Sequence, residues 1–548
     1  MIALWLALGA PASDDLEWAR AIDWVDRLGW AASRREVSAM LRLDGEGSFD
    51  RALRPEDQGL VSRLEDPTVY AVEADLVEIN GEQGRRMAVS LRQAIVYHNP
   101  AAVPLECLSL RVYPNAVGDV VVHGAWIDNR PVPSLLIGTR LKLCPAEPIA
   151  PGRRTRVLLE LTESVPAFDP RQPLGGSTLD PASTGEYGFY GAYVNLGRWL
   201  PLIAPVGRDG SFELDELAPN TEHARFDPAM FHVVLSFPER LSAATTGVEL
   251  ARREGGGTAT IVAVASAARE FAVQLGAGIS VLEATVSGTR LRVFHPTADP
   301  QMGRALLEHA RAGLELGVEL YGPLATSELD VVEAPIRVAL GMEYPGLVTV
   351  DVHHKHGIYS PSEIHEWTVV HEIAHQWWSA EVGNDPGAAP WLDEGLASFT
   401  TGVYWARRHG PEALRQRQHL DVIEPTAALQ GRGTPDLPAD LPAWRYDLFE
   451  YSAIVYGRAA LFFEVLRHQM GEPALWAALR QYRAEQWGQL AEAEDLLRAL
   501  RAHSAQPEQI DALYRRWIHE GHGYEDLLPR FEPAQLVIPE RAHGRDRR

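Results

Sequence analysis

The spacing of hydrophobic residues changes along this chain, and the changes divide it into regions. In the first region hydrophobic residues recur at helical spacing among many charged residues, as at Leu16, Ala19, Ile22 and Val25. From about residue 68 the period falls to two, which is typical of half-buried strands. The clearest alternating run consists of Met87, Val89, Leu91, Ile95 and Tyr97. We therefore expect a helical segment over residues 14–67 and a β-rich antiparallel domain over residues 68–280.

Glycine-containing turns separate several of these expected strands. Asn80-Gly81 predicts a hairpin turn between two alternating runs, and Gly255-Gly256-Gly257 predicts another. The period returns to a helical one near residue 300, where a single hydrophobic face forms from Leu306, Ala310, Gly313, Leu314, Gly317 and Tyr321. Gly322-Pro323 should end that helix.

The second half of the chain predicts a mixed domain and then helices. Two short strands are expected at residues 329–332 and 347–350, and helical patterns dominate from residue 362 onward, with Ser362 as the expected N-cap. We assign residues 281–470 to an α+β domain, residues 471–531 to a short helical C-terminal part and residues 532–548 to a loose tail. The predicted fold class is multidomain α+β.

Composition is that of an ordinary globular chain with several domains. Of its 548 residues 46% are hydrophobic and 23% are charged. The formal net charge of −23 argues against nucleic acid and anionic membrane surfaces as partners, because both attract basic patches. No apolar run is long enough to cross a membrane, so no transmembrane segment is expected.

The N-terminus and the two cysteines bear on the compartment. Residues 2–8 are apolar and Ala10-Pro11-Ala12 resembles a small-residue cleavage site, so residues 1–13 are expected to be the remnant of a secretory signal peptide without its basic end. Export to the periplasm or medium is the favoured location, and the cytoplasm is the alternative. Cys107 and Cys144 would pair in an exported chain, and two buried thiols are the alternative.

The segment His371-Glu372-Ile373-Ala374-His375 carries the strongest chemical pattern. Residues four apart share one face of a helix, so both imidazoles would point at one spot, as a tetrahedral zinc ion requires. Glu372 is offset around the helix and could take a proton from a zinc-bound water. The alternative interpretation is a pair of core histidines on a helix.

A third ligand must come from another element, since one helix face cannot close around the ion. Glu394, in Trp391-Leu392-Asp393-Glu394-Gly395, follows His375 after enough residues for a loop and the start of a second helix. We therefore expect one Zn²⁺ per chain, held by His371, His375 and Glu394. A further group, His353, His354 and His356, could form a second metal site, but a polar strand end fits its spacing better.

At these residues the sequence resembles a family. The run His371-Glu372-Ile373-Ala374-His375-Gln376-Trp377-Trp378, followed by Trp391 to Gly395, is similar to the aminopeptidase N-like zinc metallopeptidases, which are gluzincins with a thermolysin-like catalytic domain. The resemblance implies that His371, His375 and Glu394 bind zinc and that Glu372 is the general base. It covers roughly residues 68–530.

Two further roles are implied by the resemblance. Glu343 stands where the family places a glutamate that binds the substrate's N-terminal amine, although Gly341 is displaced by one place and Tyr344 replaces an asparagine. Tyr456-Gly457-Arg458 resembles the family's tyrosine, any residue, lysine, so Tyr456 is the expected oxyanion-stabilising phenol and Tyr451 its rival. Many relatives carry a large helical domain over the site, so here we expect an open cleft or one covered by another subunit of a homo-oligomer.

Together these patterns predict a zinc aminopeptidase that hydrolyses peptides. A zinc endopeptidase, or a hydrolase of other amides or of epoxides with an open cleft, uses the same chemistry and stays an alternative. From a different class, the chain could be an inactive peptidase-like scaffold that binds peptides.

Overall fold

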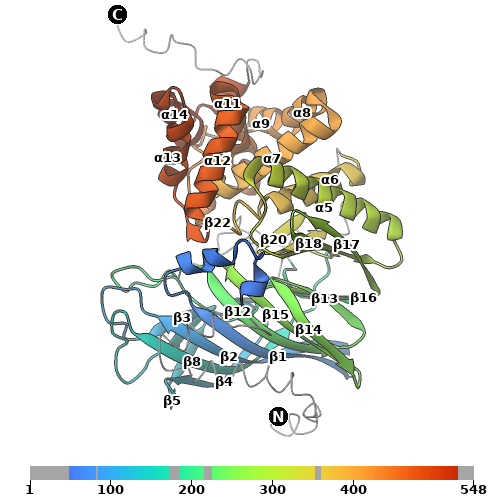
Figure 1. Cartoon of the computed structure of the whole chain (residues 1–548), viewed down its shortest axis with the longest axis vertical. Helices are drawn as coiled ribbons and strands as arrows, with labels where there is room; N and C mark the ends of the chain where they lie inside the picture. The colour runs from blue at the N-terminus through green and yellow to red at the C-terminus, as the bar shows by residue number, and fades with distance from the viewer. Residues whose placement is uncertain are drawn as a thin grey trace, which may run out of the picture.

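The computed structural model describes residues 49–81, 84–171, 185–214, 225–337, 339–351 and 359–528. Strands from the N-terminal half gather in one part of the molecule and helices from the C-terminal half gather in the other (Figure 1). One large hydrophobic core lies among the N-terminal strands, and a second lies between a smaller sheet and the helices. The predicted multidomain α+β fold class is confirmed.

An eight-stranded sheet forms the base of the N-terminal part. Its strands, in spatial order, are β14 (Val248–Gly255), β15 (Thr258–Ala268), β12 (Ala229–Pro238), β1 (Val69–Gly81), β2 (Gly84–His98), β8 (Arg154–Val165), β4 (Val120–Ile127) and β5 (Arg130–Pro131). Every neighbouring pair is antiparallel except β1 with β12, so the expected antiparallel sheet contains one parallel pair.

The predicted alternation in this sheet is confirmed. Residues of β8 are buried at every second position, and in β2 Met87, Val89 and Leu91 are buried. The turn between β14 and β15 is also where the sequence predicts it. Gly256 and Gly257 both have positive φ, 65° and 84°, as a tight two-residue hairpin turn requires.

Two four-stranded sheets pack beside this base. They contain β13 (Leu241–Thr245), β16 (Val273–Ala277), β10 (Tyr193–Leu196) and β9 (Tyr187–Tyr190) in one, and β11 (Leu202–Ile203), β3 (Leu108–Arg111), β7 (Arg140–Leu143) and β6 (Ser134–Ile137) in the other. In the second sheet Leu108 pairs with Leu143, which brings Cys107 and Cys144 together at the strand ends. The two cysteines form a disulfide, so of the two alternatives the paired one holds.

A five-stranded sheet begins the C-terminal part. Its spatial order is β17 (Ile279–Val286), β18 (Thr289–Pro296), β19 (Glu328–Ala334), β21 (Leu347–Asp351) and β20 (Gly341–Tyr344). Helix α5 (Pro300–Tyr321) connects β18 to β19 and buries the predicted hydrophobic face, and Gly322 ends it with φ of 90°. The segment around Glu343 was expected to lie between two strands, but it is itself the edge strand β20, because the Pro345-Gly346 turn folds it back on β21.

Helix α6 (Pro361–Ala374) packs on this sheet, and α7 (Trp391–His409) packs on α6. The N-cap of α6 is Ser360 and not Ser362. Pro361 suits the first helical position, and Ser360 and Glu363 form a reciprocal capping box in which each side chain accepts from the other's backbone N–H.

Further helices complete the C-terminal part. They are α8 (Pro411–Gln418), π-helical η4 (His419–Ile423), α9 (Glu424–Gly431), η5 (Ala443–Arg445), α10 (Leu448–Tyr451), π-helical η6 (Ser452–Arg458), α11 (Ala459–Met470), α12 (Glu472–Gln486), α13 (Ala493–His503), α14 (Pro507–Tyr514), π-helical η7 (Arg515–His519) and α15 (Gly523–Leu527). A two-stranded pair, β22 (Val382–Gly383) and β23 (Gln489–Leu490), links this region to the loop after α6. Within the described residues, no helix is long and apolar enough to cross a membrane.

Parts of the N- and C-terminal predictions lie outside the described residues. These are the expected signal-peptide remnant at residues 1–13, most of the expected helical segment at residues 14–67, the tail at residues 532–548, and His353, His354 and His356. Of the helical segment, residues 49–67 are described and contain the short 3₁₀ helices η1 (Phe49–Ala52) and η2 (Gln58–Arg63).

Candidate metal centre and the adjoining cleft

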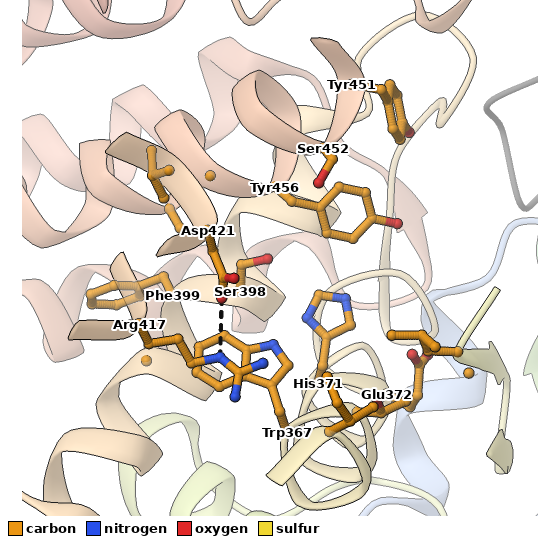
Figure 2. Close-up of a pocket in the computed structure, with 18 of the residues that line it drawn as sticks. Trp367, His371, Glu372, Ser398, Phe399, Arg417, Asp421, Tyr451, Ser452 and Tyr456 are labelled. Carbon is orange, nitrogen blue, oxygen red and sulfur yellow. Dashed lines mark hydrogen bonds and ion pairs between the residues drawn. The ribbon is translucent and has the colours of Figure 1, made fainter. Parts of the chain in front are cut away.

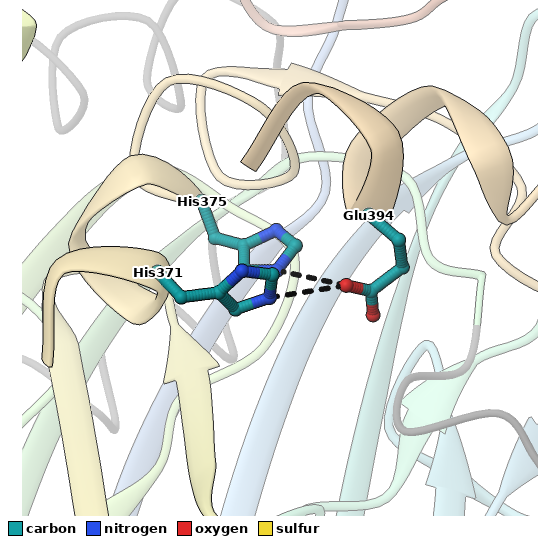
Figure 3. A group of neighbouring side chains, drawn as sticks. All are labelled: His371, His375 and Glu394. Carbon is teal, nitrogen blue, oxygen red and sulfur yellow. Dashed lines mark hydrogen bonds and ion pairs between the residues drawn. The ribbon is translucent and has the colours of Figure 1, made fainter. Parts of the chain in front are cut away.

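Helix α6 places His371 and His375 one turn apart, with both rings directed at the same point (Figure 3). Their Nε2 atoms are 3.1 Å apart, and both rings are buried. The helix forms because its capping box fixes the N-terminus, and Val369, Val370 and Ile373 join the core between the sheet and the helices. The predicted shared face is therefore present.

Glu394 lies in the first turn of α7 and reaches the two imidazoles from a second helix. Its Oε2 is 3.2 Å from His371 Nε2 and 3.3 Å from His375 Nε2. The three ligand atoms lie within 4.8 Å of one another, and all three residues are buried. Two imidazole nitrogens and a carboxylate oxygen are the donor set of a catalytic zinc site, so the residues fit the predicted ion.

Neighbouring groups orient the side chains of this cluster and shift their pKa values. His375 Nδ1 lies 3.0 Å from the carbonyl oxygen of Trp378, which holds the ring so that Nε2 faces the cluster. Burial would raise the pKa of Glu394, but the charge of His375 and hydrogen bonds from both imidazoles lower it to about 2. The same burial lowers the pKa of His371. The cluster thus keeps Glu394 ionised, which is the form that binds a metal ion, and a bound ion would displace the proton for which the pKa of His375 is raised.

Glu372 lines the cleft beside the metal cluster together with His371. Gly341, in β20, packs directly on the Glu372 carboxylate, and a Cβ atom at position 341 would overlap that carboxylate. Gly341, which is displaced by one place from the family motif, therefore has a structural role. Only a residue without a side chain lets the edge strand approach Glu372.

Tyr456 rather than Tyr451 contacts the metal cluster. The Tyr456 hydroxyl donates a hydrogen bond to Glu394 Oε1 at 2.7 Å, and its ring stacks on His371 with centroids 5.6 Å apart. Tyr451 packs edge-on against Tyr456 and lines the cleft. Tyr456 lies in the π-helical segment η6, and π-helical turns are often found where a helix must present a functional side chain.

Glu343 lines a recess separate from the cleft. It is 2% exposed and lines a small recess with Asp393, Glu270 and Arg269. Burial would lower the pKa of His375, but the negative charges of Glu343 and Glu394 raise it well above its ordinary value. The predicted substrate-binding carboxylate is thus close enough to act on the metal cluster, although it does not line the cleft.

The cleft itself has a volume of about 400 Å³ and runs from the metal cluster into the helical region (Figure 2). Its walls come from α6, α7, α8, η4, η6 and α11. Charged residues that the sequence analysis did not single out line it: Arg417, Asp421, Glu464, Glu186 and Arg198. Glu186 and Arg198 form a buried ion pair at 2.7 Å. The two residues flank the β9–β10 hairpin, in which Tyr187 pairs with Leu196.

Comparisons with known proteins agree with this geometry. Residues 319–517 match the peptidase family M1 domain. The chain is 27% identical to aminopeptidase M1-B of Oryza sativa subsp. japonica, in a match that covers 46% of this chain and 29% of the rice protein. It is 25% identical to aminopeptidase M1 of Arabidopsis thaliana, over 49% of this chain and 31% of that protein. The chain therefore spans less than a third of the length of these plant relatives.

The fold is also that of solved structures. The M1 zinc metallopeptidase from Deinococcus radiodurans superposes with a TM-score of 0.58 at 19% identity, covering 83% of this chain and 94% of that one. A mutant of that enzyme, solved with a Tyr-Ser-Ala substrate, gives 0.57 at 21% identity over the same shares. The match of residues 319–517 to the peptidase family M1 domain supports the resemblance to the aminopeptidase N-like gluzincins.

Proposed function

We propose that the chain is a zinc-dependent metallopeptidase that removes N-terminal residues from peptides. The observation that carries this proposal is the buried cluster of His371, His375 and Glu394 with Glu372 beside it, in a domain that matches peptidase family M1. The plant relatives are named aminopeptidases. A zinc ion held by these three residues would polarise the scissile carbonyl and acidify a water molecule.

Glu372 is the general base in this proposal. It faces the cleft next to His371 and is fixed by the close approach of Gly341, so its carboxylate can accept a proton from the attacking water and pass it to the leaving amine. Tyr456 is the hydrogen-bond donor to the oxygen that gains negative charge, because its hydroxyl already lies at the metal cluster.

Glu343 is the group that would set the register of the peptide. A protonated N-terminal amine needs a carboxylate at a fixed distance from the metal, and Glu343 lines a recess separate from the cleft. A peptide whose amine is at Glu343 would therefore place the residues after the scissile bond in the cleft. An endopeptidase would instead bind a blocked peptide that extends beyond Glu343 without placing an amine there.

The proposal is tested with the purified chain loaded with zinc. Zinc content is measured by atomic spectroscopy, and hydrolysis is followed with leucine p-nitroanilide and its N-acetylated form. We expect about one zinc per chain and cleavage of the free-amine substrate alone. Glu372→Gln should keep its zinc and lose roughly a hundredfold or more in kcat, since the amide cannot accept the proton.

A surface variant serves as the control for Glu372→Gln. Glu315→Gln, on α5 and exposed in a pair with Arg311, should leave kcat unchanged. Zinc binding without any hydrolysis would favour the peptide-binding scaffold. Efficient cleavage of blocked peptides at internal bonds would favour the endopeptidase.

We propose further that the chain works in an oxidising compartment outside the cytoplasm. The Cys107–Cys144 disulfide supports this, because such bonds persist mainly in exported proteins. Labelling of the chain taken from its native host with a thiol reagent, without reductant, should leave both cysteines unmodified. Two labelled thiols would instead support the cytoplasm.

A further inference from the structure

The end of the cleft farther from the metal cluster contains a buried arginine that peptide hydrolysis at the metal does not use. Arg417 lies in α8 and is 5% exposed, yet it lines the cleft. Trp367 contacts it from α6, and His371 stands four residues further along the same helix, about 6 Å along the axis. Figure 2 shows Arg417 beside Trp367, with His371 and Tyr456 toward the other end of the cleft.

Aromatic rings hold the guanidinium group in place. Its central carbon lies 3.8 Å from the ring centroid of Trp367, 4.2 Å from that of Tyr359 and 4.9 Å from that of Trp405. These contacts are cation–π interactions, and they crowd the planar faces of the group. A ligand can therefore reach Arg417 only through the N–H groups at its edge.

Arg417 has donors to spare at that edge. Its Nε donates to Asp421 Oδ2 at 3.1 Å, which uses one of the five N–H bonds of the group. Nη1 is buried and has no hydrogen-bond partner in the described part of the chain. Burial lowers the pKa of Arg417, and the charge of Asp421 opposes this shift only in part. The buried positive charge is therefore incompletely compensated.

The acidic residues near Arg417 are already engaged, and Glu363, whose charge also acts on Arg417, accepts hydrogen bonds in the capping box of α6. Asp421 accepts from Arg417 and from the Tyr359 hydroxyl at 2.7 Å. Glu464 forms an ion pair with Arg467 on the same helix. A planar acceptor with negative charge is what the remaining edge of an arginine binds best, because two parallel N–H groups match the two oxygens of a carboxylate.

We propose that Arg417 binds a carboxylate on the leaving part of the peptide. The carboxylate is either the C-terminus of a short peptide or the side chain of an acidic residue that follows the scissile bond. This inference rests on the proposed function, because it takes the cleft, which Arg417 lines and Glu343 does not, as the site of the leaving group. The chain would then favour short peptides or peptides with an acidic residue next to the cleaved one.

The test compares matched substrates that all begin with a free leucine. One arm compares leucyl-phenylalanine with its C-terminal amide, and the other compares leucyl-glutamate amide with leucyl-glutamine amide. Leucine p-nitroanilide, which has no carboxylate, reports hydrolysis itself. We expect the zinc-loaded chain to show a kcat/KM about tenfold higher for the carboxylate in at least one arm, since charge-assisted hydrogen bonds are roughly twice as strong as neutral ones.

Variants of Arg417 assign the preference to this residue. Arg417→Gln should bring the carboxylate-to-amide ratio close to one while p-nitroanilide hydrolysis continues. Arg417→Lys keeps the charge next to Asp421 and should keep only part of the ratio, because it lacks the planar fork. The matched control is Arg415→Gln, two residues away on α8 and exposed in a pair with Glu412, which should behave like the unchanged chain.

The outcomes separate this inference from the proposed function. If the p-nitroanilide is cleaved but the ratios are near one in both arms, Arg417 does not bind substrate carboxylates. The same conclusion follows if the preference survives in Arg417→Gln. If the unchanged, zinc-loaded chain cleaves none of the substrates, the proposed function itself is wrong.

Discussion

The metal centre and the far end of the cleft share helix α6 but are assembled in different ways. His371 and His375 come from one helix turn, and Glu394 comes from the next helix along the chain. Around Arg417, by contrast, Asp421 is a neighbour four residues along the same helical run, but the rings of Tyr359, Trp367 and Trp405 come from other segments that only the tertiary fold unites. A site set by helix periodicity can be predicted from sequence, whereas one set by packing between distant helices cannot.

The largest effect should come from breaking the metal centre. Glu394→Ala removes the only ligand that α7 supplies and leaves two imidazoles on one helix face, which cannot close around the ion. We expect the variant to lose most of its zinc and all measurable hydrolysis. Metal analysis after dialysis checks this, with Glu315→Gln as a surface control. Unchanged zinc content in Glu394→Ala would show that the ion is held elsewhere.

A smaller but still large effect is expected from removing the hydroxyl of Tyr456. Tyr456→Phe removes the hydroxyl at the metal cluster and should lower kcat about a hundredfold with little change in KM, because its hydrogen bond strengthens mainly in the transition state. Tyr451→Phe is the matched control, from the same wall of the cleft, and should cause only a slight change. The reverse pattern would give Tyr451 the catalytic role.

Much of the metal centre was visible in the sequence for a physical reason. The four-residue spacing of His371 and His375 places both imidazoles on one face of a helix, and the distance to Glu394 leaves room for one connecting loop. Local backbone detail was harder to predict. The N-cap of α6 is Ser360 because Pro361 takes the first helical position, and residues 341–344 form an edge strand because Pro345-Gly346 turns the chain.

The cleft residues could not be found in the same way. Arg417 stands between two glutamines on a short, polar helix, a pattern that predicts a solvated face. Its burial depends on rings supplied by residues 359, 367 and 405, which no local spacing connects to it. The buried pair Glu186 and Arg198 is a different case, because the two residues flank the β9–β10 hairpin and its register brings them together.

A variant of Glu343 tests whether the recess beside the metal centre sets the register of the peptide. Glu343→Gln removes the charge but keeps the shape of a buried side chain. We expect KM for substrates with a free N-terminus to rise about thirtyfold, since a buried charge-assisted hydrogen bond contributes about 2 kcal/mol. N-acetylated peptides should remain poor substrates of the unchanged chain. Equal KM values for Glu343→Gln and the unchanged chain would remove Glu343 from the amine site.

The smallest effect is expected from a substitution that alters the cleft and leaves the metal centre unchanged. Gly402 lies inside α7 and lines the cleft, and a Cβ atom there would meet only Leu414, at an ordinary contact distance of 3.5 Å. The glycine thus leaves open space where a larger residue would be tolerated by the helix. Gly402→Leu should fill that space and hinder substrates whose leaving residue is bulky.

The measurement compares leucyl peptides in which glycine or phenylalanine follows the scissile bond. For Gly402→Leu, kcat/KM for the phenylalanine substrate should fall about tenfold relative to the glycine substrate, because poor fit in an apolar pocket costs about 1–3 kcal/mol. Gly402→Ala, as the control, should keep the ratio and raise stability by about 0.5–1 kcal/mol, since alanine favours a helix interior over glycine. An unchanged ratio in Gly402→Leu, with zinc content intact, would show that the leaving residue does not enter this cleft. The recess at Glu343 would then be the expected binding site of that residue.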